Sequence, residues 1–450
     1  MVKNKSMDLT TGSVTKNLLL FVFPIILSNL LQHLYTVADR IVVGQFAENG
    51  TAALAAVGST GAATSLILSL FNGLAVGVNI LCSNLLGAGE DRRLRTTMHT
   101  SLILAAMVGV FLLLVGQFVT RPLLVLMNVP ADMLDLACLY VQIFFLGVPA
   151  SLVYNAGAAI LRAHGDARRP MIILAVSGLV NVALNLVLVI FLHMSVAGVA
   201  LATVAAQIVS AVWVLGILFS PRDIFKLRVK ELQVHKQAAK QVLAVGIPCG
   251  VNSIAFNFSN MILQSTVNTF GTVVVAGNVA ADSVTILAHQ VLVSFYSGTV
   301  SFVGQNYGAR KYKRVDRVTA TASLLSCSIV TVMGLLCVLF AKPLMGIFDS
   351  DPAVILAGEP KLRIYSFYCG IFAVSEVLLG ALRGMKRSMI PSMINILSIC
   401  GVRILWTLVF FPLVPTVDMV YVCYPISWAV STVGLLVAYL YYRRRMQAEE

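Results

Sequence analysis

Two carboxylates stand inside apolar stretches of this 450-residue chain, where a carboxylate is rarely found. Asp39 lies in the stretch 18–44, and Glu376 lies in the stretch 354–382. A charged carboxylate inside a bilayer costs roughly 2.5 to 3.5 kcal/mol on insertion scales, so such residues usually face a cavity and mark an ion or proton path. Because groups of this kind can exchange a proton or a cation near neutral pH, we interpret Asp39 as a coupling residue.

The residues around Asp39 show a helical polar stripe. Ser28, Gln32, Tyr35 and Asp39 follow one another at steps of four, three and four, which places them on one helical face. Arg40 is adjacent, and a structural ion pair is the alternative reading, but neighbouring residues on a helix do not face each other. The stripe predicts a helix that lines a transport route, with Gln32 facing a substrate cavity.

Amide and hydroxyl side chains occur in two later apolar stretches. Asn181 and Asn185 share a helical face, and Thr203 lies in the following stretch. Oxygen atoms of these groups, together with a carboxylate, are good ligands for a hard cation, and they also hold a carboxylate in place for protonation. Each signal alone is weak, because Asn and Thr commonly form hydrogen bonds between membrane helices. Combined with Asp39 they predict a site for a proton or Na⁺, and we expect no other metal.

The second half of the chain has its own polar stripe. Its members follow at steps of four, three, four and four along one apolar stretch: Ser253, Asn257, Asn260, Gln264 and Asn268. We expect Asn257 and Gln264 to line the substrate cavity, together with Glu376 and Asn155, which are separated by the repeat offset of 221 residues described below. The alternative for Glu376 is a buried structural ion pair with Arg403.

No motif points to an enzyme. The chain has no Ser/His/Asp set, no HExxH, no phosphate-binding loop and no dinucleotide fingerprint. We therefore expect a protein that is not an enzyme and has no cofactor apart from a coupling ion.

The composition and the apolar segments of the chain indicate that transmembrane helices position these residues. Hydrophobic residues make up 58% of the chain and charged residues 11%, which is typical of an all-α protein that crosses a membrane many times. Mean hydropathy is +0.90. Twelve apolar segments predict twelve transmembrane helices: 18–44, 54–86, 97–119, 133–160, 170–193, 196–219, 242–270, 283–306, 318–341, 354–382, 389–411 and 416–442.

The net charge of +13 comes from basic residues that gather in alternate loops. This pattern follows the positive-inside rule, so we expect both termini in the cytoplasm and no nucleic-acid partner. We expect the protein to lie in a bacterial cytoplasmic membrane as a monomer in contact with lipid.

The two halves of the chain repeat. Arg121-Pro122-Leu123 recurs as Lys342-Pro343-Leu344, and Pro170 recurs as Pro391, both at an offset of 221. In the first helix of each half the offset is 224, which pairs Pro24 with Pro248. We predict an N-lobe at 1–220, a linker at 221–241 and a C-lobe at 242–450. Six helices per lobe give both copies the same orientation, with the substrate path between them.

The chain resembles the MATE (multidrug and toxic compound extrusion) family over its whole length, most closely the DinF-like branch. The matching stretches are PIILSNLLQHLYTVADRIVVG, QNYGA at 305–309, and the turns LRAHGDARRP and LRGMKRSMIP. The resemblance implies two six-helix lobes in a V-shaped bundle, alternating access, and export of organic, mostly cationic lipophilic compounds in exchange for H⁺ or Na⁺. Small organic cations and drugs are then the partners.

Carried over residue by residue, the cation site of this family falls on Asp39, Asn181 and Thr203, with Tyr35 nearby. Pro24 falls where the first helix bends, which agrees with the donor that proline removes from a helix. One departure concerns Asn185, because the DinF-like branch often has a second acid in that helix.

Two other functions compete with this interpretation. A lipid-linked oligosaccharide flippase of the same superfamily shares the plan but needs a cationic cavity, and the cations Arg40 and Arg403 in apolar segments are set here against the acids Asp39 and Glu376. A membrane-embedded transferase would need a nucleophile, a base or a metal set at a membrane face, and none is apparent.

Overall fold

The apolar segments form helices because a backbone without access to water must satisfy its hydrogen bonds internally. The computed structural model describes residues 6–46, 50–126, 129–220, 225, 227–348 and 351–448. Its longer helices are α1 (Val14–Phe46), α2 (Gly50–Gly87), α3 (Asp91–Leu126), α4 (Ala131–Ala163), α5 (Arg168–Asn185), α6 (Ser195–Leu218), α7 (Lys236–Asn268), α8 (Thr272–Gly308), α9 (Tyr312–Leu339), α11 (Pro352–Gly384) and α14 (Val417–Ala448).

The prediction of an all-α, polytopic membrane protein is confirmed. Within the described ranges, eleven helical spans are long and apolar enough to cross a membrane, and α2 adds the apolar helix Phe71–Gly87. Several of the helices begin or end outside the predicted segments, and α7 begins at Lys236 inside the predicted linker. Of that linker, residues 221–224 and 226 lie outside the described residues, and the short helix η2 (Val229–Glu231) precedes α7.

Two spans depart from regular α-helix. After Asn185, α5 continues as the π-helix η1 (Leu186–Phe191). The other span is divided into α12 (Met389–Asn395), η3 (Ile396–Gly401), α13 (Val402–Leu405), η4 (Trp406–Phe410) and η5 (Phe411–Leu413). The predicted spans 170–193 and 389–411 are therefore present but not uniform, and π-turns occur frequently at functional sites. The additional helix α10 (Ala341–Met345) joins α9 to α11.

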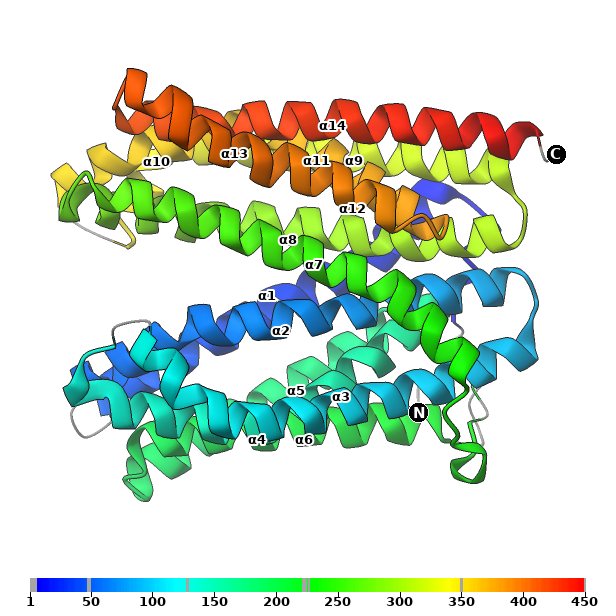
Figure 1. Cartoon of the computed structure of the whole chain (residues 1–450), viewed down its shortest axis with the longest axis horizontal. Helices are drawn as coiled ribbons and strands as arrows, with labels where there is room; N and C mark the ends of the chain where they lie inside the picture. The colour runs from blue at the N-terminus through cyan, green and yellow to red at the C-terminus, as the bar shows by residue number, and fades with distance from the viewer. Residues whose placement is uncertain are drawn as a thin grey trace. The chain divides into compact units, whose positions relative to one another are not determined.

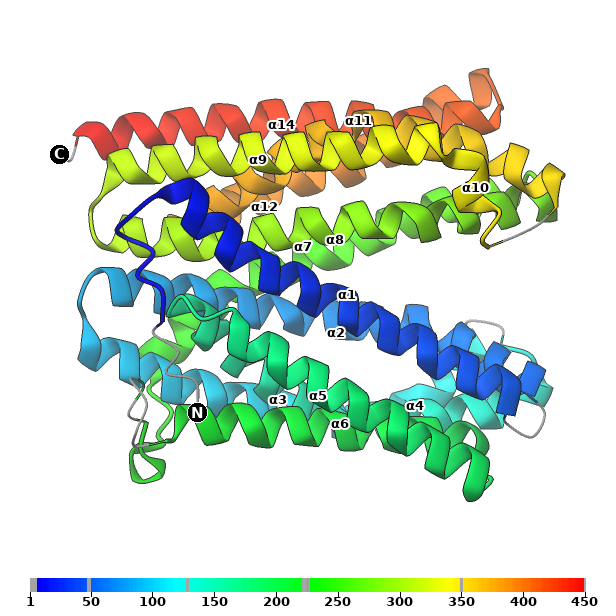
Figure 2. The same ribbon diagram turned by 180° about the vertical axis from the view of Figure 1, so that it is seen from behind.

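The predicted repeat of two six-helix halves is confirmed in the arrangement of the helices. The starts of α3, α4 and α5 recur at the starts of α9, α11 and α12 at an offset of 221. Residues with positive φ recur at the same offset, with Gly89 and Gly165 in the first half and Arg310 and Lys386 in the second. In the first half α4 packs against α2, α3 and α6 (Figure 1). In the second half α11 packs in the same way against α8, α9 and α14 (Figure 2).

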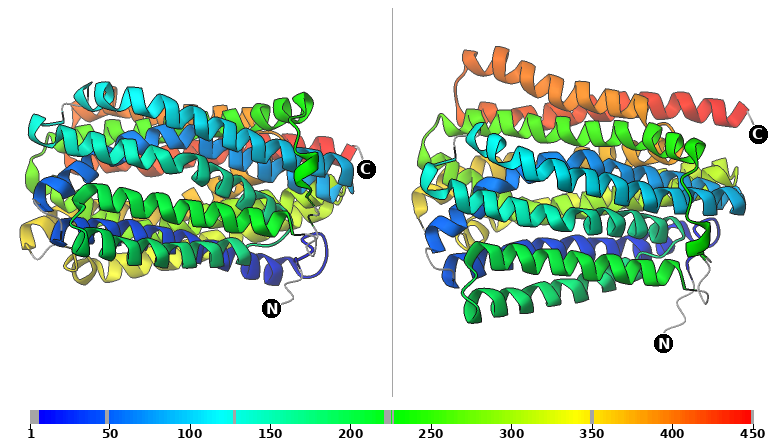
Figure 3. Two further views of the ribbon diagram at one scale, coloured as in Figure 1. Left: turned by 90° about the horizontal axis from the view of Figure 1, so that it is seen from below. Right: turned by 60° about the horizontal axis from the view of Figure 1, so that its bottom comes forward.

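By its internal contacts the chain divides into two compact units. Unit 1 comprises Met1–Met7 with Leu27–Gly250, and unit 2 comprises Asp8–Ile26 with Val251–Glu450. The helices within each unit run nearly along a common direction (Figure 3). The helices α1 and α7 each contribute to both units, and Pro24 and Pro248 lie inside them just before the residues at which they pass from one unit to the other. The helix bend at Pro24, the V-shaped bundle and the lobe boundaries at 220 and 242 stay predictions.

Glycines let the first half of α7 approach α2 closely in unit 1. A Cβ added to Gly77 would lie 3.0 Å from Gly246 Cα, and one added to Gly73 would overlap the backbone of Gly250. In unit 2 the matching contact joins α8 to the first half of α1, because a Cβ on Gly298 would lie 2.6 Å from Val22 Cγ2. Gly77 and Gly298 occupy equivalent positions of the repeat, so both crossings depend on a small residue.

Candidate functional site

The structure places Asp39 of α1 against α5 within unit 1. Asn185 Nδ2 donates a hydrogen bond to Asp39 Oδ1 over 2.5 Å. The side chains of Asn181 and Thr203 also interact with this half-buried carboxylate. The four side chains that the sequence analysis grouped from three separate stretches therefore meet at one place.

A directed chain of hydrogen bonds connects the neutral members of this group. Asn185 Nδ2 also donates to Asn181 Oδ1 at 3.3 Å, and Asn181 Nδ2 donates to Thr203 Oγ1 at 3.4 Å. The Thr203 hydroxyl in turn donates to the backbone carbonyl of Val199 at 3.0 Å. The first two members are four residues apart on α5 and Thr203 projects from α6, so the chain depends on the packing of α5 against α6.

Asn185 is the most enclosed member of the group. Its side chain is completely buried, and its Oδ1 atom accepts no hydrogen bond from any residue that the structure describes. A buried amide oxygen normally has a partner, because leaving it unsatisfied costs about 1 to 3 kcal/mol. This oxygen, beside a carboxylate, is suited to accept a cation or the proton of a protonated carboxyl group.

Tyr35 holds α1 onto α5 one turn before Asp39. Its hydroxyl donates to the Ala175 carbonyl over 3.0 Å, and its ring covers Gly178 so closely that a Cβ at Gly178 would overlap the ring. A larger residue at position 178 would move Tyr35 and therefore the part of α1 that carries Asp39. These contacts tie α1 to α5, and a role of Tyr35 in cation or proton coupling stays a prediction.

One residue near the carboxylate, Tyr140, was not predicted from the sequence. Tyr140 of α4 lies close enough to Asp39 and Arg40 to feel both charges. It also packs against the apolar cluster formed by α1, η1 and α6 around Val43 and Val199. A single tyrosine in an apolar stretch carries no distinctive signal, and only the packing of α4 reveals its position.

Gln32 and Asn155, the residues of unit 1 predicted to line a substrate cavity, are not among the side chains that interact with Asp39. Gln32 is exposed on α1. Asn155 lines a separate cavity of about 10 Å³ whose other walls include Ser101, Leu74 and Val242. A cavity of this size holds about one water molecule, and the roles of Gln32 and Asn155 toward a substrate stay predictions.

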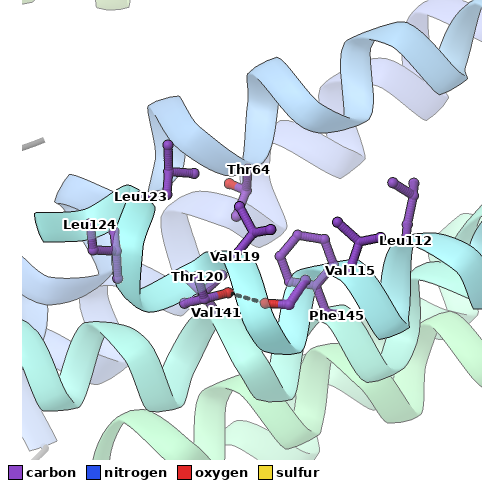
Figure 4. A pocket seen from close by; sticks show the side chains of 10 residues that line it. Thr64, Leu112, Val115, Val119, Thr120, Leu123, Leu124, Val141 and Phe145 are labelled. Atoms are coloured by element: carbon purple, nitrogen blue, oxygen red, sulfur yellow. Dashed lines mark hydrogen bonds between the residues drawn. The ribbon is translucent and has the colours of Figure 1, made fainter. Parts of the chain in front are cut away.

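A larger cavity in unit 1 is apolar. It has a volume of about 150 Å³ and lies between α2, α3 and α4, with Phe145, Val115 and Val119 among its walls (Figure 4). The Thr120 hydroxyl, drawn beside Val141, donates to the Gly116 carbonyl at 2.5 Å. The cavity has no ionisable lining residue, so it is not part of the Asp39 site.

In unit 2 the polar stripe of α7 is partly occupied by internal hydrogen bonds. Gln264 donates to Asn268 Oδ1 at 2.9 Å and accepts from Asn278 Nδ2 at 2.9 Å. The Tyr421 hydroxyl donates to Asn278 Oδ1 at 3.2 Å. Gln264 therefore ties α7 to α8, while Asn257 is half-buried on the same helix. Their roles toward a substrate stay predictions.

Glu376 and Arg403 do not form the ion pair that the sequence left open. Glu376 is half-buried and makes no hydrogen bond or ion pair with any described side chain, although it feels the charge of Arg383. Arg403 instead donates to Asn260 Oδ1 at 2.8 Å and lies over the ring of Tyr424. Helix spacing could not show this, because it fixes the face of a residue but not the neighbouring helix that the face meets.

No group of three or more His, Cys, Asp or Glu side chains gathers to hold a metal ion in the described part of the chain. The candidate cation site is the mixed set around Asp39, which offers one carboxylate together with amide and hydroxyl oxygens. Such a set suits a hard monovalent cation or a proton.

Comparison with known proteins supports the repeat and the fold. A family model described as MatE matches the chain twice, over residues 24–187 and 248–409. The chain is 27% identical over 439 residues to the "Probable multidrug resistance protein YoeA" of Bacillus subtilis (strain 168), covering 96% of this chain and 94% of that protein. It is 24% identical over 395 residues to the "Probable multidrug resistance protein NorM" of Thermotoga maritima, covering 87% of this chain and 84% of that protein.

Solved structures share the fold. One is described as the outward-facing conformation of a multidrug resistance MATE family transporter of the MOP superfamily. It aligns with a TM-score of 0.85 at 23% identity, covering 100% of this chain and 99% of that one. The two matches of the family model begin at the two prolines that the sequence analysis paired, Pro24 and Pro248.

Proposed function

Since the chain belongs to the MatE family, we propose that it is a secondary active multidrug efflux antiporter of a bacterial cytoplasmic membrane. It exports organic, mostly cationic lipophilic compounds in exchange for H⁺ or Na⁺ by alternating access. Relatives described as multidrug resistance proteins support multidrug export. The protein is not an enzyme, works as a monomer with both termini in the cytoplasm, and binds neither nucleic acid nor a cofactor other than the coupling ion.

The observation that carries this proposal is the contact between Asp39 and Asn185. A single carboxylate surrounded by amide and hydroxyl groups can be loaded with a cation or a proton and later emptied. The protonmotive or sodium-motive force supplies the energy, since one charge moved across about 100 mV releases roughly 2.3 kcal/mol. Asp39 is the coupling residue, and Asn181, Asn185 and Thr203 hold the coupling ion.

The test is efflux by the purified protein in liposomes, with a fluorescent lipophilic cation as substrate. A proton gradient and a sodium gradient are imposed separately, for the wild type and for Asp39→Asn. The wild type should respond to one gradient, and the variant should lose that response because a neutral amide cannot exchange a charge. Asp135→Asn is the matched control, since Asp135 is an exposed acid of the same unit.

If Asp39→Asn retains gradient-driven efflux, Asp39 is not the coupling residue, and Glu376 becomes the candidate. No movement of the cation under either gradient would overturn the antiporter and favour the lipid-linked oligosaccharide flippase. That rival is supported by the two buried cationic side chains of unit 2, Arg403 and Lys361.

A further inference from the structure

Unit 2 contains a buried arginine without a carboxylate partner. The side chain of Arg403, on α13, is 1% exposed and is among the largest fully buried side chains of the described chain. It forms no ion pair with any acid that the structure describes. Removing a charged group from water costs several kcal/mol, and an arginine inside a membrane segment is by default a functional candidate.

Some N–H donors of the Arg403 guanidinium have no acceptor among the described residues. Its Nε donates to Ser427 Oγ at 3.4 Å and its Nη1 donates to Asn260 Oδ1 at 2.8 Å. An arginine carries five N–H donors, and the Nη2 atom of Arg403 has no acceptor among the described residues. The neutral partners fix the plane of the guanidinium, and the Nη2 edge, which has the geometry to donate to a planar oxyanion, has no acceptor among the described side chains.

A second buried cation lies near Arg403 but has its own acidic partner. Lys361 of α11 is 3% exposed and close enough to Arg403 for the two charges to repel each other. Its Nζ forms an ion pair with Asp282 Oδ1 at 2.5 Å, and the Asp282 side chain is 55% exposed. Asp282 is therefore committed to Lys361, and the positive charge of Arg403 remains uncompensated.

Aromatic rings surround the guanidinium. Arg403 Cζ lies 4.6 Å from the ring centre of Tyr424 and 5.6 Å from that of Phe256. Behind them, Phe372 stacks on Trp428 with ring centres 5.0 Å apart. The indole Nε1 of the fully buried Trp428 has no hydrogen-bond partner among the described residues. The surroundings therefore combine cationic and N–H donors with flat apolar surfaces.

We propose that unit 2 contains a binding site for the oxyanion group of an aromatic or lipophilic compound, with the guanidinium of Arg403 as its anchor. Asn260 and Ser427 orient the guanidinium, Asp282 is held away from it by Lys361, and the rings of Phe256 and Tyr424 contact the apolar body of the ligand. This rests on the proposed export function and extends its substrate class to compounds that carry a carboxylate or a similar anionic group.

The experiment measures equilibrium binding by the full-length protein in nanodiscs, without an ion gradient. The probes are a xanthene dye that carries a free carboxylate and the methyl ester of the same dye, which differ only in that charge. The wild type should bind the acid more tightly than the ester. Arg403→Gln should weaken binding of the acid by about ten- to a hundredfold, the range for a lost hydrogen bond to a charged group, and leave binding of the ester almost unchanged.

Two further variants make the outcome specific. Arg403→Lys keeps the charge and should restore part of the preference for the acid. Arg383→Gln removes another buried arginine of the same unit, which contacts Tyr296 and Ser392, and should not change the preference. Size-exclusion and thermal-unfolding profiles establish that each variant is folded.

Either of two results would overturn the proposal. The first is a wild type that binds the ester as tightly as the acid, which can be measured even if the Arg403→Gln protein does not fold. The second is an equal loss of both dyes in folded Arg403→Gln, which would mean that the guanidinium only ties α13 to α7 and α14. Because binding needs no gradient, these results are independent of the Asp39 coupling test.

Discussion

In unit 1, the side chains of Asn181, Asn185 and Thr203 gather at the carboxylate of Asp39. At the repeat offset of 221, the corresponding residues of unit 2 are Val402, Trp406 and Tyr424. Tyr424 lies against the guanidinium of Arg403, which directly follows Val402. The same part of the duplicated fold therefore carries a carboxylate in one unit and a cation in the other.

The helix beside each charge shows the same contrast. Tyr140 of α4 lies near Asp39, and its counterpart at the offset of 221 is Lys361 of α11, which lies near Arg403. Asp39 itself corresponds to Leu263 at the offset of 224. Helix starts and turns follow the repeat closely, whereas these few polar side chains do not. The fold depends on the distribution of apolar residues, and the chemistry of each unit depends on a handful of side chains placed on it.

The largest expected effect is the loss of ion coupling when the carboxylate of unit 1 is removed, compared with removal of the buried arginine of unit 2. Asp39→Asn should reduce gradient-driven efflux of a lipophilic cation to the background of empty liposomes. Arg403→Gln should keep the dependence of this efflux on the gradient, because Arg403 and its hydrogen-bond partners Asn260 and Ser427 all belong to unit 2. Loss of gradient dependence in both variants would break the assignment of coupling to unit 1 alone.

A steric substitution should affect unit 1 almost as strongly. Gly178→Val places a side chain where the ring of Tyr35 lies, which displaces α1 from α5. Overpacking of this kind costs about 1 to 3 kcal/mol, and we expect efflux to fall at least about tenfold. Gly216→Val is the control in the same unit, since a Cβ at Gly216 meets no atom within 4 Å. Equal activity of the two variants in the liposome assay would show that Tyr35 does not position Asp39.

An intermediate effect is expected when the negative charge at the Asp39 site of unit 1 is increased. Asn185→Asp adds a second carboxylate 2.5 Å from Asp39, which creates a stronger site for a hard cation. For a wild type driven by the sodium gradient, the Na⁺ concentration for half-maximal efflux should fall by roughly tenfold, which corresponds to about 1.4 kcal/mol. Asn155→Asp serves as the control because Asn155 lines a different cavity. A sodium response that does not change in Asn185→Asp would argue against this residue as an ion ligand.

The smallest effect concerns the turns that the two units share. Gly89 and Arg310 occupy equivalent positions with φ of 70° and 55°, a region that favours glycine. Gly89→Ala should destabilise the protein by about 1 kcal/mol, although a Cβ there meets no neighbour, because only the backbone conformation opposes it. Arg310→Gly should be neutral or stabilise it by under about 1 kcal/mol. Thermal unfolding in detergent measures both, and an Arg310→Gly variant destabilised as much as Gly89→Ala would contradict the equivalence of the turns.

Much of the candidate site could be read from the sequence. The steps of three and four residues placed Tyr35 and Asp39 on one face of α1, and the structure has them both turned toward α5. The pair Asn181 and Asn185 was equally readable, because residues four apart on a helix lie one above the other. Helical periodicity is a local property, so a single stretch of sequence contains all the information that it needs.

Other features required the three-dimensional structure. Gln264 has the spacing of a cavity-lining residue, yet its amide is occupied by Asn268 and Asn278. Tyr140 could not be linked to Asp39, and Arg403 was considered as a partner for Glu376 although it meets Asn260 and Tyr424. These outcomes depend on which helices become neighbours, and a pattern within one helix does not specify its neighbour.

The sequence by itself determined the membrane class, the spans, the repeat and the polar faces, because bilayer thickness and helical geometry constrain each segment separately. Only the tertiary structure decided that α1 and α7 contribute to both units, and that π-turns interrupt two of the spans. It also decided that unit 2 buries an uncompensated arginine where unit 1 has a carboxylate. These features arise from packing between segments far apart in the chain, and packing energy is shared among many side chains at once.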